Sequence, residues 1–269
     1  MAIIYNATFD KNTRKLSFED KAGNEIYSFT VPERTPTVDD ITKPLTFKAT
    51  LDGSTVKLTK FGSPTGAFQT SRNGGNTWSD YTLDDVITLN TGDELSFRAK
   101  SDRTSAPTET DFFAFKLEGK IEAWHNVMSL YRTSDFATYK SVVSRAFSKM
   151  FYGCTSLTKA PALPATSLAQ FCYFMMFYEC QSLTKAPELP ATTLANYCYL
   201  YMFDGCQSLK EVRIYATKTA TGALDDWLAS VSATGDFYCR PNATIFPTGV
   251  SGRPSGWTRH ALSDYPVTP

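Results

Sequence analysis

The residues that could carry catalysis in this chain are few, and their spacing matches no reactive arrangement. Of the 269 residues only two are histidines, His125 and His260, and they lie far apart in the sequence. Nucleophilic catalysis needs a serine, cysteine or threonine beside such a base, and the sequence does not place either histidine in a triad. It also contains no phosphate-binding loop and no dinucleotide fingerprint. We therefore expect no catalytic residue and no cofactor.

Adjacent carboxylates offer the next candidate chemistry, either acid–base catalysis or metal binding. Three pairs of neighbouring aspartates occur, at 39–40, 84–85 and 225–226. The first two pairs lie in loop-like sequence, and the third lies in a segment that we expect to be helical and solvated. None of them follows the spacing of a calcium-binding loop. We expect no metal site, and an enzyme is the weakest of the three functional hypotheses considered below.

The six cysteines point to packing rather than to metal or disulfide chemistry. No two of them form the Cys-x-x-Cys motif of a zinc site. Five recur at intervals of 26 residues, with Cys154, Cys180 and Cys206 in one phase and Cys172 and Cys198 in another. Equivalent residues of stacked repeats point inward together, so we expect these cysteines to be buried as free thiols.

These cysteines belong to a longer repeat that organises the second half of the chain. The motif Met-Phe-Tyr-Gly-Cys-Thr-Ser-Leu at 150–157 returns in close variants at 176–183 and 202–209. A fixed period of this length is typical of stacked repeats, in which each unit buries its apolar side against the next. Leu168, Cys172 and Met176 recur at i, i+4 and i+8, which predicts one face of a helix. Each repeat is therefore predicted to contain a short strand, a loop and a helix.

The motifs Met-Phe-x-Gly-Cys-x-Ser-Leu and Leu-Pro-Ala-Thr-x-Leu-Ala resemble the BspA-like leucine-rich repeats of Bacteroides surface proteins. The resemblance covers roughly residues 137–257 and is specific for the repeat class, but it does not identify a ligand. The segments Leu-Asp-Asp-Trp-Leu at 224–228 and Pro-Ser-Gly-Trp at 254–257 resemble the C-terminal cap of that family. Such proteins are adhesins, secreted surface proteins and structural proteins of phages, so the resemblance implies a solenoid with a role in adhesion or virion structure.

The N-terminal residues predict a three-stranded meander with strands near 2–9, 14–19 and 25–31, followed by a proline-containing linker to residue 44. Alternation places an apolar set on one face, namely Ile3, Tyr5, Phe9, Leu16, Phe18, Tyr27, Phe29 and Val31. An isolated sheet of this size is marginally stable and has open edges. We expect it to be an anchor that associates with copies of itself, as a trimer, or with a capsid protein.

Residues 45–132 predict a small all-β sandwich, because short alternating segments are separated by turn sequences. These segments are 45–49, 55–58, 86–89, 95–98 and 113–117. The domain resembles the β-domain that often precedes the repeats. The segment Ser-Arg-Asn-Gly-Gly-Asn-Thr-Trp at 71–78 resembles the Asp-box hairpin of sialidases, with Asn73 in place of the aspartate. A single copy favours a tight hairpin that packs on Trp78 rather than a sialidase.

The predicted fold class is therefore α+β: an N-terminal β-meander, a small all-β sandwich, and a BspA-like leucine-rich-repeat solenoid with a C-terminal cap. The predicted domains are an anchor and linker at 1–44, the sandwich at 45–132 and the solenoid at 133–269. Aromatic residues that share a phase in successive repeats are the candidate ligand contacts, unless they pack between repeats. They are Tyr152, Tyr178, Phe171, Tyr197 and Phe174.

The composition of the chain excludes further classes of function. A formal net charge of zero argues against a general nucleic-acid-binding protein, and no apolar stretch has the length of a membrane span. The chain begins without a secretory signal pattern, which fits assembly in the cytoplasm. We expect a non-enzymatic virion structural and adhesion protein, such as a phage head fibre or decoration protein, attached through its N-terminus and exposed on the virion surface for contact with a host glycan or protein. The alternative is a BspA-like adhesin on a bacterial cell surface.

Overall fold

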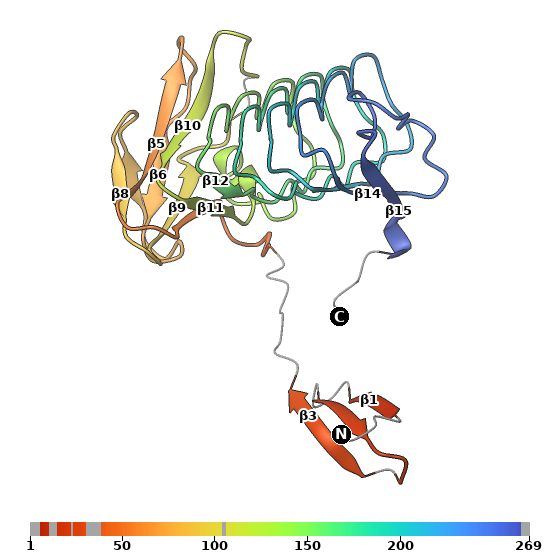
Figure 1. Ribbon diagram of the computed structural model, residues 1–269. Coiled ribbons are helices and arrows are strands. Elements are labelled where there is room, and N and C mark those ends of the chain that lie inside the picture. The colour runs from red at the N-terminus through yellow and green to blue at the C-terminus, as the bar shows by residue number, and fades with distance from the viewer. Residues whose placement is uncertain (1–5, 11–14, 23, 31–38, 104–105, 265–269) are drawn as a thin grey trace. The chain divides into compact units, whose positions relative to one another are not determined.

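The computed structural model describes residues 6–10, 15–22, 24–30, 39–103 and 106–264 (Figure 1). The chain divides into two compact units, of which the first contains the N-terminal strands and the second spans Asp39–Pro266. No helix in the described part of the chain is long and apolar enough to cross a membrane.

The first unit is an antiparallel sheet in the order β1-β2-β3. Its strands are β1 (Asn6–Asp10), β2 (Lys15–Glu19) and β3 (Glu25–Thr30), which confirms the predicted meander within the described residues. The register pairs Phe9 with Leu16, Leu16 with Phe29, and Phe18 with Tyr27. Positions that pair directly across an antiparallel sheet lie on the same side of it. The backbone therefore places these five apolar positions on one face.

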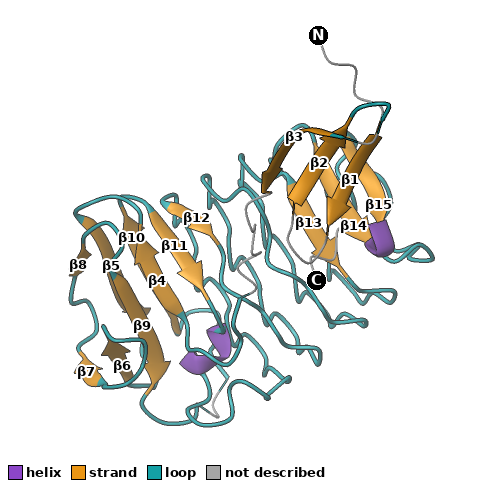
Figure 2. Ribbon diagram, turned by 90° about the horizontal axis from the view of Figure 1, so that it is seen from below, coloured by secondary structure: helices purple, strands orange, loops and turns teal. Residues whose placement is uncertain are grey.

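The second unit begins with two sheets. Their strands are β4 (Thr46–Ala49), β5 (Ser54–Phe61), β6 (Phe68–Ser71), β7 (Ser79–Tyr81), β8 (Ile87–Leu89), β9 (Glu94–Ala99), β10 (Phe112–Glu118), β11 (Ile121–Trp124) and β12 (Leu157–Lys159). One sheet has the order β10-β5-β8 and the other β12-β11-β4-β9-β6-β7 (Figure 2). Each of the five strands predicted from alternation between residues 45 and 117 is present, which confirms that part of the prediction. A single 3₁₀ turn, η1 (Val127–Leu130), follows β11.

The two sheets pack through aromatic rings that alternation directs inward. Phe47 of β4 and Phe97 of β9 both contact Phe115 of β10, with ring centroids 4.7 Å and 5.2 Å apart. All three rings are fully buried. Rings of this size bury enough apolar area to dominate the stability of a small sheet pair.

The first repeat covers the edges of both sheets. The Phe115 N–H of edge strand β10 donates to the Met150 carbonyl at 2.8 Å, and β11 pairs in parallel with β12, which belongs to the first repeat. An uncovered sheet edge would present unpaired backbone groups. The predicted domain boundary between residues 132 and 133 therefore lies inside this unit, where backbone hydrogen bonds cross it.

The repeats themselves consist of turns that stack on one another, and we call residues 141–232 the repeat stack. Alternate amides donate to the next repeat, as when the Phe147 N–H bonds the Cys172 carbonyl and the Phe151 N–H bonds the Met176 carbonyl, both at 2.9 Å. The amides between them close turns within their own repeat, as when the Met150 N–H bonds the Phe147 carbonyl at 3.3 Å. Figures 1 and 2 show these segments as successive coils without helices.

The predicted α+β class with a leucine-rich-repeat solenoid is wrong. The protein is nearly all β, with 3% of residues helical and 30% in strands, and its small sheets form no solenoid. The helices expected in the repeats fail because every fourth residue has a positive φ, whereas an α-helix needs φ near −63° throughout. These residues are Arg145, Lys149 and Gly153; Phe171, Met175 and Glu179; Tyr197, Tyr201 and Gly205; and Gly222, Asp226 and Ser230. The last three lie in the segment expected to be a cap helix, which forms turns as well.

The C-terminal end of the unit is a parallel sheet with the order β13-β14-β15. Its strands are β13 (Glu211–Ile214), β14 (Gly235–Cys239) and β15 (Trp257–Ala261), and the 3₁₀ turn η2 (Leu262–Asp264) follows. Trp227 is fully buried and donates its indole N–H to the Gly252 carbonyl at 2.9 Å. Phe237 and Phe246 pack against the Trp227 ring. Trp227 belongs to the last turn of the repeat stack, and Phe237 and Phe246 cover it with apolar surface.

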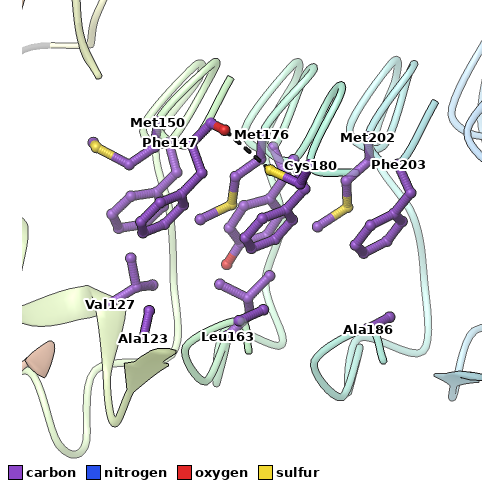
Figure 3. Packing of buried hydrophobic residues seen from close by; sticks show 14 of the residues in the cluster. Ala123, Val127, Phe147, Met150, Leu163, Met176, Cys180, Ala186, Met202 and Phe203 are labelled. Carbon is purple, nitrogen blue, oxygen red and sulfur yellow. Dashed lines mark hydrogen bonds between the residues drawn. The ribbon is translucent and has the colours of Figure 1, made fainter. Parts of the chain in front are cut away.

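The core of the repeat stack is a set of columns in which equivalent side chains of successive repeats touch (Figure 3). The rings of Phe115, Phe151, Phe177 and Phe203 stack with centroid spacings of 5.4, 5.4 and 5.5 Å. All six cysteines are free and buried, which confirms the prediction for the thiols. Each thiol of one phase donates to a phenylalanine carbonyl of the preceding layer: Cys154 to Phe115, Cys180 to Phe151 and Cys206 to Phe177, at 3.2, 3.1 and 3.0 Å.

Candidate functional site

The candidate ligand contacts lie on the outer side of the same turns whose inner side forms the core. The four-residue turn period buries two successive residues and leaves the next two at the surface, so Cys172 and Tyr173 are buried while Phe174 is only partly buried. The predicted residues all occupy these outer positions. We call them, with Tyr201, the aromatic band: Tyr152, Phe171, Phe174, Tyr178, Tyr197 and Tyr201.

The rings of the aromatic band stack on one another between repeats. Tyr152 lies parallel to Tyr178, with centroids 5.1 Å apart and an interplanar angle of 3°, and Phe171 lies parallel to Tyr197 at 4.8 Å and 8°. Phe171 also meets Phe174 edge to face, at 5.8 Å. Tyr152 is 37% exposed, and the other rings of the band are partly buried. Stacked pairs of this kind contribute roughly 0.5–1.5 kcal/mol each beyond area burial, so the band supports the fold as well as forming a surface.

Two cations of the first repeat extend the aromatic band. The Arg145 guanidinium lies 4.2 Å from the centroid of the Phe171 ring. The Lys149 ammonium lies 5.8 Å from the Phe174 centroid and 4.9 Å from that of Phe112, a residue of β10. Sequence reasoning missed both cations, although each shares the repeat phase of an aromatic residue, Arg145 with Phe171 and Lys149 with Tyr201. A cation over a ring face gains roughly 0.5–1 kcal/mol at an exposed site.

The opposite end of this surface carries carboxylates. Burial raises the pKa of the Asp204 carboxyl, Asp226 and Glu179 raise it further, and a hydrogen bond from Ser230 opposes them. Burial also raises the pKa of the Tyr178 phenol, and the charge of Asp204 adds to the effect. The outer side of the repeat stack therefore changes from cationic in the first repeat to anionic towards the last, with aromatic rings between.

The predicted anchor residues are positioned only in part. Phe9, Leu16, Phe18, Tyr27 and Phe29 belong to β1, β2 and β3 and share one face by register. Ile3, Tyr5 and Val31 lie outside the described residues. Among the described residues, β1 and β3 each pair only with β2, so each leaves one edge of the sheet without a strand partner.

The aspartate pairs serve local structure. Asp39 accepts hydrogen bonds from the His125 backbone N–H at 3.2 Å and from the Lys159 ammonium at 2.6 Å. Asp84 bonds the Thr59 hydroxyl, and the Asp226 backbone N–H donates to the Ser251 hydroxyl at 3.0 Å. Within the described ranges, no three histidine, cysteine, aspartate or glutamate side chains are grouped so that they could hold a metal ion.

One polar pair was not anticipated from sequence. The His260 Nε2 of β15 lies 2.7 Å from an Asp236 carboxylate oxygen of β14, and Tyr238 stacks on the imidazole at 4.7 Å. The signal was absent because 24 residues separate the two partners and only the parallel register of β14 and β15 aligns them. The pair bridges two adjacent strands, and the structure gives it no further role.

The Asp-box-like hairpin is a tight turn between β6 and β7. The Asn73 side chain accepts a hydrogen bond from the Thr77 backbone N–H at 3.0 Å and donates to the Thr77 hydroxyl at 2.8 Å. The Arg98 guanidinium lies over the Trp78 ring at 4.2 Å. Asparagine thus replaces aspartate at this position while keeping the turn closed.

No known protein family, curated protein or solved structure matches this chain.

Proposed function

We propose that this chain is a non-enzymatic structural and adhesion protein that uses the aromatic band to contact a glycan or protein on a host surface. The observation that carries this proposal is the register of the band, since backbone hydrogen bonds hold its rings at fixed spacing across successive repeats. A rigid surface loses little conformational entropy when it binds, which favours recognition.

The geometry also limits how the aromatic band can bind. Tyr152 and Tyr178 each turn one ring face towards the other, and Phe171 is covered by Tyr197 and by Arg145. The ring edges and the phenol groups of Tyr152, Tyr178 and Tyr197 are then among the parts that stacking leaves for contact. Ring edges carry partial positive charge, and phenols donate and accept hydrogen bonds. Such a surface suits a partner rich in hydroxyl or carbonyl oxygens, as glycans and protein loops are.

Within this proposal the first unit is the attachment element. Its apolar positions share one face, and a partner that covers such a face stabilises the sheet. We place the protein on a virion, as a head fibre or decoration protein, with capsid proteins or further copies of the chain in a trimer as the partners of the sheet. The resemblance of the repeat motifs supports this placement, and it supports a bacterial cell-surface adhesin as the alternative.

The binding test compares the Tyr152→Ala/Tyr178→Ala double variant with wild type on glycan arrays and on intact host cells. The expected result is loss of binding by the double variant. Tyr215→Ala is the matched control, because Tyr215 directly follows β13 and lies outside the aromatic band. Wild-type binding by the double variant would contradict the role of the band.

The attachment test removes residues 1–38. The cut should precede Asp39, whose carboxylate bonds Lys159 and the His125 backbone inside the second unit. The truncated protein is expected to remain folded but to lose self-association and incorporation into particles, measured by mass in solution and by particle composition. If it still associates and still decorates particles, the anchor lies elsewhere. Detection of the full chain on bacterial cells rather than on particles would favour the alternative.

A further inference from the structure

Arg103, in the loop that follows β9, is a buried charge without a counterion. It is 7% exposed, and its Nε–H has no hydrogen-bond partner among the described residues. Its Nη1 donates to the Leu130 carbonyl at 3.5 Å, which is a long hydrogen bond. No carboxylate among the described residues forms an ion pair with Arg103. Burying an unpaired charge costs several kcal/mol. A bound counterion would lower this cost for Arg103.

The carboxylates nearest to Arg103 in sequence are already engaged. Asp102 pairs with Arg132 at 3.1 Å and accepts from the Thr133 backbone N–H at 2.8 Å. Glu109 lies 3.9 Å from the Arg145 guanidinium. Asp111 accepts from the Ser63 backbone N–H at 2.8 Å and from the Thr108 hydroxyl at 2.9 Å. The described residues therefore supply contacts around the guanidinium but no carboxylate in an ion pair with it.

Three aromatic rings compensate part of the burial. The Arg103 guanidinium carbon lies 4.9 Å from the Phe113 centroid, 5.6 Å from that of Tyr131 and 5.7 Å from that of Phe68. Rings interact with the flat face of a guanidinium, whereas its five N–H donors lie in its plane. The rings thus enclose the group, and because its Nε–H is buried, its Nη N–H groups are the donors left for a ligand. Burial lowers the pKa of Arg103 to about 10, so the group remains protonated at neutral pH.

Arg103 is one of the residues that line a cavity of about 140 Å³. The wall combines hydroxyl-bearing and apolar side chains with one carboxylate: Ser63, Thr65, Thr108, Pro64, Ala106, Pro107 and Asp111. Asp111 would disfavour an anion placed directly beside it, but its oxygens already accept two hydrogen bonds. The volume exceeds what a single water needs and accommodates a small polyatomic group.

We propose that this cavity binds a small oxyanion, a carboxylate or a tetrahedral phosphate or sulfate, through the Nη N–H donors of Arg103. Guanidinium groups bind both chemistries through charge-assisted, often bidentate hydrogen bonds. The site lies between the loops that precede β6 and β10, and it is independent of the aromatic band. It therefore adds a second binding function to the surface already proposed.

The test observes the arginine Nε–H groups of the full chain by ¹H–¹⁵N NMR during titration with sodium acetate and, separately, with sodium phosphate. Ionic strength is held constant with sodium chloride. The expected result is a saturable shift of the Arg103 Nε–H signal, assigned as the signal missing from Arg103→Lys. Saturation by acetate alone identifies a carboxylate site, and saturation by phosphate alone identifies a site for tetrahedral anions. A signal that responds saturably to neither anion overturns the proposal.

Matched variants sharpen this result. Arg103→Gln lacks the Nε–H signal, so its binding is followed through the backbone amide signals of Ser63 and Thr108 at the cavity wall. It should weaken anion binding roughly 10- to 100-fold, since it removes a charge-assisted hydrogen bond. Arg72→Gln should leave it unchanged, because Arg72 is exposed and donates to the Thr88 carbonyl at 3.2 Å in another part of the sandwich. Wild-type affinity in Arg103→Gln would also overturn the proposal. If Arg103→Gln does not fold, the wild-type titration still decides the question.

Discussion

Strand β10 and the first repeat perform the same task with different backbones. The Phe115 N–H of β10 donates to the Met150 carbonyl just as the Phe151 N–H donates to the Met176 carbonyl, at 2.8 and 2.9 Å. The thiols follow the same rule, since Cys154 donates to the Phe115 carbonyl and Cys180 to that of Phe151. In its contacts, β10 therefore acts as a further layer that precedes the repeat stack.

The difference between the two lies in what the other half of the backbone does. β10 is extended and pairs its remaining amides and carbonyls with β5. The repeats also have a layer on each side, but their alternate amides close turns within the repeat instead of pairing with a neighbour. Each such turn needs a residue with positive φ, which costs a residue other than glycine on the order of 1–2 kcal/mol. Layers can therefore stack through backbone hydrogen bonds without extended strands, provided that the core offsets this strain.

The largest expected effect tests whether the buried column of stacked phenylalanine rings offsets the backbone strain of the repeats. Phe177→Ala should lower the free energy of unfolding by about 3–5 kcal/mol, because the ring is fully buried and stacked on both sides. Tyr178→Ala, one residue further on and at the surface, should cost about 1 kcal/mol. Urea denaturation measures both. Equal losses would mean that the inner and outer columns contribute alike.

The next effect separates backbone strain from crowding at two glycines with similar φ. Gly153 has φ +69° and open space where a Cβ would lie, whereas a Cβ on Gly222, with φ +61°, would overlap the Tyr197 ring. Gly153→Ala should cost about 1 kcal/mol from backbone strain. Gly222→Ala should cost about 1–3 kcal/mol more, because the ring must also move. Thermal or urea unfolding of the two variants gives the comparison, and a Gly222 variant no worse than the Gly153 variant would contradict it.

The contrast between the extended strands and the turns of the repeats also explains which parts of the fold the sequence predicts. Alternation with a period of two located β4, β5, β8, β9 and β10, because an extended strand leaves that pattern directly. The 26-residue period likewise predicted that equivalent residues stack and that the cysteines are buried. The prediction that the repeats contain helices was wrong, although the sequence does carry a pattern that argues against a helix. Leu168, Cys172 and Met176 advance by four residues, and on an α-helix each such step would drift roughly 40° around the axis.

The candidate site was predictable to a similar degree. The shared repeat phase identified the rings of the aromatic band, because stacked layers bring equivalent residues together. It could not identify the contact between Lys149 and Phe112, since that contact depends on β10 being a layer of the stack. The sequence could not predict that Arg103 is buried either. The rings around it, Phe68, Phe113 and Tyr131, come from three separate parts of the chain.

A pH effect tests the Cys154 thiol, which links the first repeat to β10. Burial raises the pKa of the Cys154 thiol from its ordinary value of 9.0 to about 12. The folded state therefore keeps a proton that the unfolded state loses, so this contribution to stability is complete below about pH 9 and declines as the pH rises towards the folded pKa. One such thiol should remove about 1.4 kcal/mol of unfolding free energy per pH unit in that window.

Cys154→Ser provides the control for this effect, because a hydroxyl keeps a hydrogen-bond donor but does not titrate there. Urea unfolding from about pH 9 to about pH 11 should show a slope that is shallower than wild type by one thiol's contribution. A variant with the wild-type slope would mean that Cys154 is not protected in the folded state.

The smallest expected effect concerns the aromatic band at the surface, where the Arg145 guanidinium takes the place of a stacked ring. Arg145 lies over Phe171 at 4.2 Å and also faces the exposed carboxylate of Glu109 at 3.9 Å. Arg145→Gln should cost about 0.5–1 kcal/mol through loss of the cation–π contact, whereas an exposed ion pair contributes little and is screened by salt. Unfolding at low and high salt separates the two causes. A loss that persists at high salt assigns the effect to the Phe171 ring, and one that vanishes assigns it to Glu109. In the first case, Arg145 extends the outer column by one layer, as Phe115 extends the inner one.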